Sequence, residues 1–193
     1  SLHDALPIYM ISIDGDMSTN DMAIVLANGA AGNPEITSKD ADYETFKQTL
    51  QAICQGLAQR IASDGEGATK FLTVNVKGTK SFADAKTIGM SVAKSPLVKT
   101  AFFGEDPNWG RVICAVGYAG VPMNPQQTIV KFGGIPVYAN GVGAAFDEEA
   151  LREVMAQHDI IIDIDMGDGD GEATVWTCDF SYEYVKINGE YHT

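Results

Sequence analysis

Apolar residues recur at every third or fourth position over one long stretch that starts at Asp40 or Asp42, and this spacing predicts an amphipathic helix. The apolar positions are Tyr43, Phe46, Leu50, Ile53, Leu57 and Ile61. We expect the helix to end at Ser63-Asp64-Gly65, because glycine commonly follows the last helical turn. Cys54 shares this apolar face, so the pattern predicts that its thiol packs in the core.

Three shorter helices are predicted downstream. Residues 82–93 form the first, which is closed by Ser95-Pro96. The second begins at Asp106-Pro107, with the aspartate as N-cap, the proline in the first helical position and Trp109 in the core. The third begins at Asp147, where acidic residues in the first turn interact favourably with the helix dipole.

Short apolar or alternating runs predict strands before and between these helices. An alternating run at 10–14 and a short buried run at 24–26 precede the long helix. The other predicted strands are 71–76, 129–132, 135–138, 160–166, 173–180 and 182–187. Because no linker or repeat interrupts the pattern, it predicts one α+β domain with helices packed on a substantial sheet.

The charge balance excludes several classes of partner. The chain has 13 basic and 26 acidic residues, a net charge of −13, which argues against nucleic acid and anionic membrane surfaces. It is compatible with small cationic substrates. No apolar run approaches the roughly 18–20 residues that a membrane span requires, and residues 1–9 lack the features of a signal peptide. We therefore expect a soluble, cytoplasmic protein.

The metal-binding and disulfide residues are few and widely spaced. Cys54, Cys114 and Cys178 match neither a disulfide framework nor a zinc site, and reduced core thiols are expected. The three histidines have no ligand spacing, so no metal is expected. The acidic run DIDMGDGDGE at 163–172 is similar to a calcium loop, but Ala173 stands where glycine is needed. A solvated hairpin turn is the better prediction.

The residues alone do not form a catalytic set. The run GEGATK at 65–70 lacks the glycine spacing of a phosphate loop, and 89–93 lacks the last glycine of a nucleophile elbow. Ser18 and Thr19 carry hydroxyl groups but no partnered base, so turn hydrogen bonds are expected. Composition and spacing therefore predict an acidic α+β domain without a defined chemistry.

Six sequence blocks, in order, resemble the glutamate N-acetyltransferase family, whose members are also called ornithine acetyltransferases. They are IDGDMSTND (13–21), LANGAAGN (26–33), DGEGATKF (64–71), SPLVKTAFFGEDPNWGR (95–111), ATVWTCD (173–179) and YVKINGEYHT (184–193). The resemblance covers residues 10–193, which we interpret as the β-chain domain, whereas residues 1–9 fit poorly and are interpreted as a non-native segment. It implies a layered sheet-and-helix sandwich like that of N-terminal-nucleophile hydrolases.

The resemblance implies an enzyme of arginine biosynthesis that moves acetyl from N2-acetylornithine to glutamate through an acetyl-threonine intermediate. Its precursor cuts itself into an α chain and a β chain that assemble as α2β2. The new N-terminal threonine is the nucleophile, with its own α-amino group as base. That threonine lies upstream of Met10, and Thr19 is internal, so we expect no catalytic residue in this chain and no activity from it alone. No cofactor is implied, and acetyl-CoA as a second acetyl donor stays open.

Three positions match the substrate-binding residues of the family: Glu66, Asn188 and Thr193. The Glu66 carboxylate can accept hydrogen bonds from an ornithine-type ammonium group. Asn188 offers an amide donor and an acceptor, which suit the α-carboxylate and α-nitrogen of an amino acid. The hydroxyl or terminal carboxylate of Thr193 is expected to close the pocket. Without the resemblance, Glu66 and Asn188 read as ordinary turn residues.

Two other functions stay open on sequence grounds. One is a related self-processing aminopeptidase or amidase, which would transfer the acyl group to water. The other is a non-catalytic binding domain, which is what the chain encodes without an upstream threonine.

Overall fold

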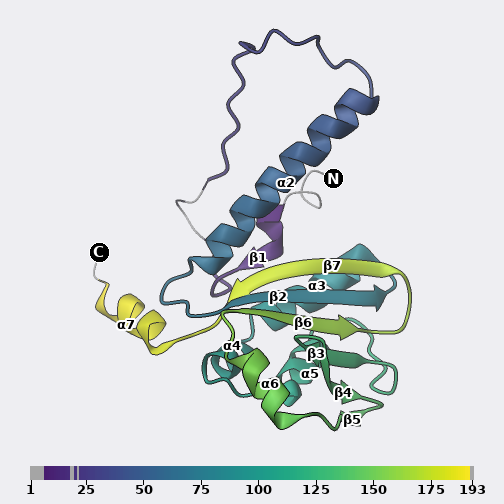
Figure 1. Cartoon of the computed structure of the whole chain (residues 1–193), viewed down its shortest axis with the longest axis vertical. Coiled ribbons are helices and arrows are strands. Elements are labelled where there is room, and N and C mark those ends of the chain that lie inside the picture. The colour runs from purple at the N-terminus through teal and green to yellow at the C-terminus, as the bar shows by residue number, and fades with distance from the viewer. Residues whose placement is uncertain (1–6, 18–19, 21, 192–193) are drawn as a thin grey trace.

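The chain folds around one mixed β-sheet, shown in Figure 1. The computed structural model describes residues 7–17, 20 and 22–191. In those residues the strand order is β1-β7-β2-β6-β3-β4-β5. The strands are β1 (Ile11–Ser12), β2 (Phe71–Thr79), β3 (Ile129–Phe132), β4 (Ile135–Ala139), β5 (Val142–Gly143), β6 (Asp159–Asp165) and β7 (Gly171–Cys178). The helices are the 3-10 turn η1 (Pro7–Met10), α2 (Ala41–Ser63), α3 (Phe82–Ala93), α4 (Pro96–Phe103), α5 (Trp109–Gly117), α6 (Glu148–Met155) and α7 (Tyr182–Glu190).

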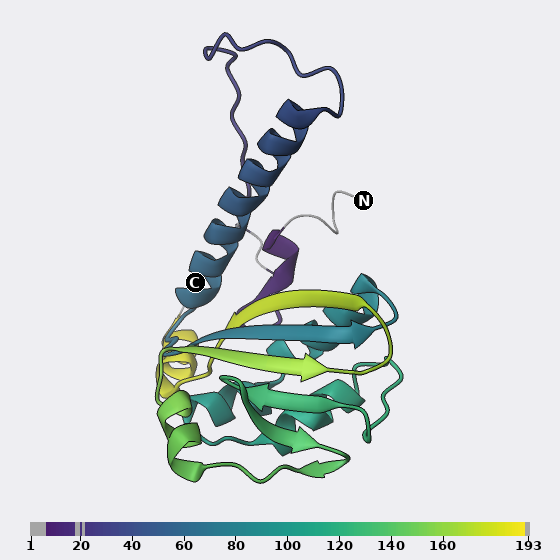
Figure 2. The ribbon, with the colours of Figure 1, turned by 45° about the vertical axis from the view of Figure 1, so that its right-hand side comes forward.

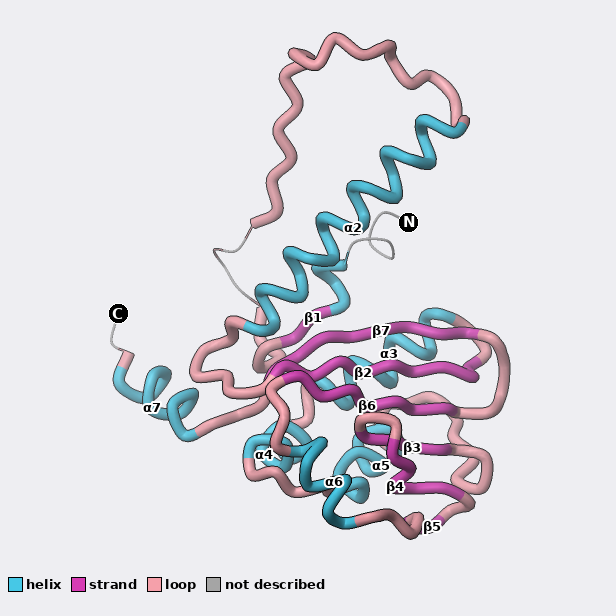
Figure 3. The backbone as a smooth tube through the Cα atoms, in the orientation of Figure 1, coloured by secondary structure: helices cyan, strands magenta, loops and turns pink. Residues whose placement is uncertain are grey.

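Strand β2 runs through the middle of the sheet and shows how alternation builds the core. It pairs in parallel with β6 and antiparallel with β7, so Val74 lies between Ile162 and Val175. All three side chains are buried on one face. Helix α3 packs closely on this face, since a Cβ atom at Gly89 would lie 2.8 Å from Cγ2 of Val175. Helices α4 and α5 extend the same layer (Figure 3). The predicted α+β class, with helices layered on a sheet, is confirmed.

The opposite face of the sheet is lined by polar side chains that bond to one another across the strands. Thr174 donates to Asn75 over 2.9 Å, and the Asn75 amide donates to Asp163 over 3.0 Å. Lys77 pairs with Asp165 at 3.2 Å. This bonding accounts for the polar positions that alternate with apolar ones in β2, β6 and β7.

The segment before the first long helix departs from its prediction. Residues 24–26 were expected to form a buried strand, but the structure shows an extended, exposed arm, with the Leu26 side chain 91% exposed. Figure 2 shows this arm and helix α2 projecting from the sheet. The prediction is wrong because β-propensity reflects packing against neighbours, and within the described residues no strand lies beside the arm.

Helix α2 begins as predicted but does not bury its apolar face. The Asp40 carboxylate accepts hydrogen bonds from the backbone N–H groups of Asp42 and Tyr43, which caps the helix. Its buried residues are Ala58 and Ala62, whereas Leu57 is 55% exposed. Cys54 is only half-buried and Cys114 is exposed, so the prediction of three core thiols holds for Cys178 alone.

Two segments around position 100 show capping that was not predicted. Helix α3 ends at Ala93 as predicted, but Ser95 also accepts from the backbone N–H of Val98 and begins helix α4, which was not predicted. The N-cap of α5 is Asn108 rather than Asp106, since the Asn108 side chain accepts from the backbone of Arg111 at 3.1 Å. Trp109 is half-buried.

The end of the chain also differs, because residues 182–187 form part of helix α7 instead of a strand. The Ser181 hydroxyl accepts from the backbone N–H groups of Glu183 and Tyr184 and thereby caps the helix. The alternating tyrosines suggested a strand, but in the folded chain this segment lies beyond the edge of the sheet (Figure 1).

Candidate functional site

The turn that carries Glu66 lies where helix α2 ends and strand β2 begins. The backbone N–H of Ala68 donates to the carbonyl of Gly65 over 2.9 Å and closes the turn. Gly67 takes a φ of +65°, which favours glycine. A Cβ atom there would lie 2.6 Å from the backbone nitrogen of Tyr184. Glycine therefore allows the turn to lie directly against helix α7.

Two of the three predicted site residues meet at this point. The side-chain amide of Asn188 donates to Oε2 of Glu66 over 2.7 Å, and also to the carbonyl of Tyr184 over 3.0 Å. Both side chains are exposed, so a small polar molecule can reach the carboxylate and the amide together. Asn188 lies on a helix, not in the turn that its neighbour Gly189 suggested. Thr193 lies outside the described residues.

Tyr184 joins this pair to the segment after strand β1. Its hydroxyl donates to Oδ2 of Asp14 over 3.0 Å. Burial raises the pKa of Tyr184 to about 12, helped by the hydrogen bond to Asp14 and by the negative charges of Asp14, Asp16 and Glu66. The phenol is therefore neutral at neutral pH and acts as a donor. The acidic block at 13–21 was singled out by resemblance, and its contact with α7 had no local signal in the sequence.

A buried lysine that the sequence reasoning missed lies beneath helix α7. The Lys99 side chain is 0% exposed, and its ammonium donates to Oγ1 of Thr177 over 2.8 Å and to the carbonyl of Cys178. Burial lowers the pKa of Lys99, while the neighbouring Cys178 and Asp179 act in the opposite direction. Burial likewise raises the pKa of the Cys178 thiol. The available signal was a lysine inside the apolar run of 96–103.

Asp179 fastens the end of strand β7 to the start of β2. Its carboxylate accepts from the backbone N–H of Thr69 at 2.8 Å, from the Thr69 hydroxyl at 2.6 Å and from the backbone N–H of Lys70 at 2.9 Å. Three donors satisfy a carboxylate that is almost completely buried. This arrangement holds the strand ends on either side of the Glu66 turn.

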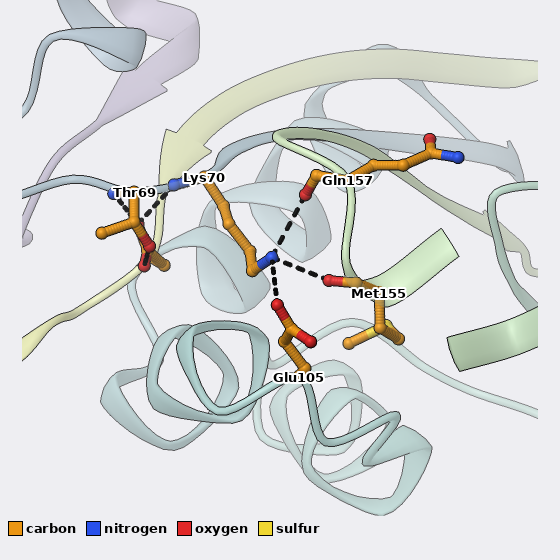
Figure 4. A network of polar contacts seen from close by, with 6 residues as sticks. Thr69, Lys70, Glu105, Met155 and Gln157 are labelled. Carbon is orange, nitrogen blue, oxygen red and sulfur yellow. Dashed lines mark hydrogen bonds and ion pairs between the residues drawn. The ribbon is translucent and has the colours of Figure 1, made fainter. Parts of the chain in front are cut away.

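Lys70 extends the same network towards helix α6. Figure 4 shows its ammonium group directed at three oxygen atoms. It donates to Oε1 of Glu105 at 3.2 Å, to the Met155 carbonyl at 2.8 Å and to the Gln157 carbonyl at 3.2 Å. These contacts are satisfied within the protein, so Lys70 supports the site without facing it.

The other chemical candidates are accounted for by local structure. Asp165 accepts from the backbone of Gly167 at 3.1 Å, and Lys80 pairs with Asp168 at 3.6 Å, as in a solvated turn. Among the described residues, no three His, Cys, Asp or Glu side chains are grouped as metal ligands, and no helix is both long and apolar enough to span a membrane. Ser18 and Thr19 lie outside the described residues.

Comparison with known proteins identifies close relatives. A profile described as the ArgJ family matches residues 8–193. The chain is 48% identical to the arginine biosynthesis bifunctional protein ArgJ, mitochondrial, of Schizosaccharomyces japonicus, over 95% of this chain and 43% of that protein. It is 49% identical to the arginine biosynthesis bifunctional protein ArgJ of Geobacter sulfurreducens, over 95% of this chain and 47% of that protein. The chain thus spans about half the length of these relatives.

A solved structure supports the fold. The crystal structure of arginine biosynthesis bifunctional protein ArgJ from Bacillus halodurans matches with a TM-score of 0.90 and 38% sequence identity, over 95% of this chain and 87% of that chain. At this identity and coverage, the sheet, its helices and the turn before β2 can be read as a shared architecture. The layered α+β class predicted from the sequence is therefore found in a relative as well.

Proposed function

The chain belongs to the ArgJ family, and on that premise we propose that it is part of a glutamate N-acetyltransferase of arginine biosynthesis. The enzyme would move acetyl from N2-acetylornithine to glutamate, releasing ornithine and forming N-acetylglutamate. Within the enzyme, this chain would supply substrate contacts. The names of the relatives support a role in arginine biosynthesis, and the chain's own geometry is compatible with the proposed reaction.

The observation that carries the proposal is the contact between Glu66 and Asn188. These side chains are 122 positions apart in the sequence, yet the amide nitrogen and the carboxylate oxygen lie 2.7 Å apart. The Asn188 amide donates to Glu66 and to the Tyr184 carbonyl, so the pair presents the Glu66 carboxylate and the Asn188 amide oxygen as acceptors. These oxygens suit the ammonium group of an amino-acid substrate. Thr193, which follows α7, is proposed as the third contact.

The proposed chemistry proceeds in two half-reactions. The hydroxyl of an N-terminal threonine, deprotonated by its own α-amino group, attacks the acetyl carbonyl of N2-acetylornithine. The C–N bond breaks, ornithine leaves with the proton on its amine, and the acetyl group stays on the threonine. The glutamate amine then attacks this ester and regenerates the hydroxyl. We propose that the threonine lies outside the residues of this chain, so the chain alone is inactive.

The partner we propose is the remainder of the parent protein, the α chain, in an α2β2 assembly. The exposed apolar side chains of the arm and of helix α2 support a partner, with Ile53 and Leu57 each 55% exposed. The chain also spans only 43–47% of the two relatives named above. We propose a cytoplasmic location, although the Schizosaccharomyces japonicus relative is named as mitochondrial.

The test is an assay of the complete protein encoded at the same locus. Acetyl transfer from N2-acetylornithine to glutamate is measured by chromatography, and mass spectrometry determines whether the chain is cleaved before a threonine. Both are expected. Glu66→Ala and Asn188→Ala should each raise KM for the amino-acid substrates about tenfold or more, because a charge-assisted hydrogen bond is lost.

The matched control is Glu149→Ala, since Glu149 makes only an exposed ion pair with Arg152. It should leave KM unchanged. Release of acetate to water without N-acetylglutamate would support a hydrolase instead. An uncleaved protein without transfer would leave only common ancestry with the ArgJ family. Adding acetyl-CoA as the sole acetyl donor tests whether N-acetylglutamate is also made from that source.

A further inference from the structure

Helix α7 carries Asn188 although none of its residues is buried. It therefore gains little from the hydrophobic effect, which normally fixes a helix on its domain. The described contacts that hold it are polar or aromatic: the Ser181 hydroxyl donates to the Gly67 carbonyl at 2.5 Å, and Tyr182 meets the edge of Phe103 with ring centroids 5.2 Å apart. The position of Asn188 relies on such contacts.

A further contact starts from the buried ammonium of Lys99. It donates to Oγ1 of Thr177, to the carbonyl of Cys178 and, over 3.7 Å, to Sγ of Cys178. In addition, Nζ lies 4.5 Å from the centroid of the Phe180 ring, within the range of a cation–π interaction. Desolvation strengthens this interaction, since water does not compete for the charge.

The Phe180 ring in turn contacts helix α7. It stacks on Tyr184, with centroids 4.4 Å apart and an angle of 18° between the planes. The carbonyl of Tyr184 accepts a hydrogen bond from the Asn188 amide, which in turn reaches Glu66. A continuous line of contacts therefore joins the buried ammonium to the exposed pair.

We propose that Lys99 is a positioning residue for the Glu66–Asn188 pair, because its ammonium holds Phe180 under Tyr184 and thereby fixes helix α7. The role of the pair in substrate binding rests on the proposed function, whereas the effect of Lys99 on α7 does not. A purely space-filling role would not require a charge. Methionine has similar length and would fill the same volume, but Oγ1 of Thr177 and the carbonyl of Cys178 would lose a donor. A variant that removes only the ring is therefore needed to isolate the cation–π contact.

The experiment compares variants of the complete protein. Lys99→Met removes the charge, Phe180→Leu removes the ring but leaves the Lys99 hydrogen bonds, and Phe180→Tyr keeps an aromatic ring. Lys80→Met is the matched control, because Lys80 makes only an exposed ion pair with Asp168. Hydrogen exchange of the backbone amides of α7 and of β2 is measured for each variant, and so are kcat and KM for N2-acetylornithine.

Phe180→Leu should speed exchange in α7 about tenfold and leave β2 unchanged, as expected from the loss of a desolvated cation–π contact. Lys99→Met should speed exchange in α7 at least as much, and it should also affect the neighbouring strands, because Thr177 and Cys178 of β7 lose a hydrogen-bond donor. KM should rise by about the same factor, with kcat changed less than about threefold. Phe180→Tyr and the control Lys80→Met should both keep the α7 exchange rate and KM of the unmodified protein.

Unchanged exchange in α7 for both Phe180→Leu and Lys99→Met would overturn the proposal. In Phe180→Leu, faster exchange in β2 to the same extent as in α7 would also overturn it, because the ring would then stabilise the whole domain. If Lys99→Met does not fold, hydrogen exchange in Phe180→Leu alone tests the proposal. A complete protein that transfers no acetyl would refute the proposed function, while the exchange data would still test the link from Lys99 to α7.

Discussion

The sheet and helix α2 contain the same kinds of apolar residue in equally regular patterns, yet they differ in what those residues contact. Ile162 in β6 is 0% exposed, whereas Leu57 on α2 is 55% exposed. The sheet pairs its strands with one another and is covered by α3, α4 and α5, while α2 and the arm project from it (Figure 1). An amphipathic pattern thus shows that a face can be buried without showing which surface buries it.

Helix α7 is intermediate between these two regions. Like the arm, it has no buried residue, but hydrogen bonds join it to the turn of Glu66 and to Asp14. The three regions therefore illustrate three sources of order: apolar burial, polar contact, and local helix capping. Mutations can separate these sources, because each predicts a different loss of stability.

The largest expected contrast is between two apolar truncations. Ile162→Ala should lower the free energy of unfolding of this chain by about 2–5 kcal/mol, because it leaves a cavity in the core. Leu57→Ala should change it by less than about 0.5 kcal/mol, since the side chain is exposed. Urea unfolding measures both. Similar losses for the two variants would break the comparison, and a larger loss for Leu57→Ala in the complete protein would show that a partner covers α2.

A second contrast uses two lysines that each form an ion pair. Lys70→Met should cost about 1–3 kcal/mol, because the buried Met155 carbonyl and the part-buried Gln157 carbonyl lose their donor. Lys47→Met should change stability by less than about 0.5 kcal/mol, since its pair with Glu44 at 3.6 Å is exposed on α2. Chemical denaturation is again the measurement. Equal effects would mean that the network in Figure 4 does not stabilise the domain.

The third prediction concerns α7 and alkaline pH. Because the pKa of Tyr184 is raised to about 12 from its ordinary value of 10.0, the neutral phenol is favoured in the folded state. Its contribution is therefore complete below about pH 10 and is lost as the pH rises through about 12.

Tyr184→Phe should remove this alkaline loss and cost about 0.5–1.5 kcal/mol near neutral pH, the usual range for one hydrogen bond. Phenolate absorbance and hydrogen exchange in α7 follow the two effects. An alkaline transition in α7 that persists in Tyr184→Phe would show that another group is responsible.

The smallest effect is expected at the start of α2. Hydrogen bonds from the Ser38 hydroxyl and from the backbone N–H groups of Tyr43 and Asp42 lower the pKa of Asp40 below its ordinary value of 3.8. The carboxylate therefore caps the helix above about pH 4, and the cap is lost as the pH falls through the lower folded-state pKa.

Amide exchange at residues 42–45 should rise at acid pH before exchange in β2 does. Asp40→Asn is the comparison, because its amide oxygen can still cap but does not titrate. An acid-induced change of the same size in Asp40→Asn would exclude the Asp40 carboxylate as its cause.

The sequence predicted much of this molecule wherever the governing interaction is local. Helix α3 has the predicted bounds, α6 has Asp147 as its N-cap, and α2 starts after Asp40. Capping hydrogen bonds and apolar spacing act over a few residues, so they can be read directly. The alternation of predicted helices and strands gave the α+β class that the structure confirms, and the resemblance added Glu66 and Asn188 as candidates.

The errors arose where a residue had two possible local roles. Helix α4 was missed because Ser95 follows the end of α3 and also begins the next helix, and the alternation after Ser181 suited a strand as well as the exposed helix α7. Whether such a segment becomes a strand depends on where it lies relative to the sheet, because a strand needs a neighbouring strand for its hydrogen bonds. No local signal supplies that neighbour.

The contacts that build the site belong to long-range packing. Glu66 and Asn188 are 122 residues apart in the sequence but in contact in the fold. Gly67 lets the turn lie against α7, and Asp179 holds the end of β7 at the start of β2. Lys99 shows the same limit, since a lysine in an apolar helix looks alike in sequence whether it is buried or exposed. Its burial follows from strand register and helix packing, which are set by the shape of the whole core.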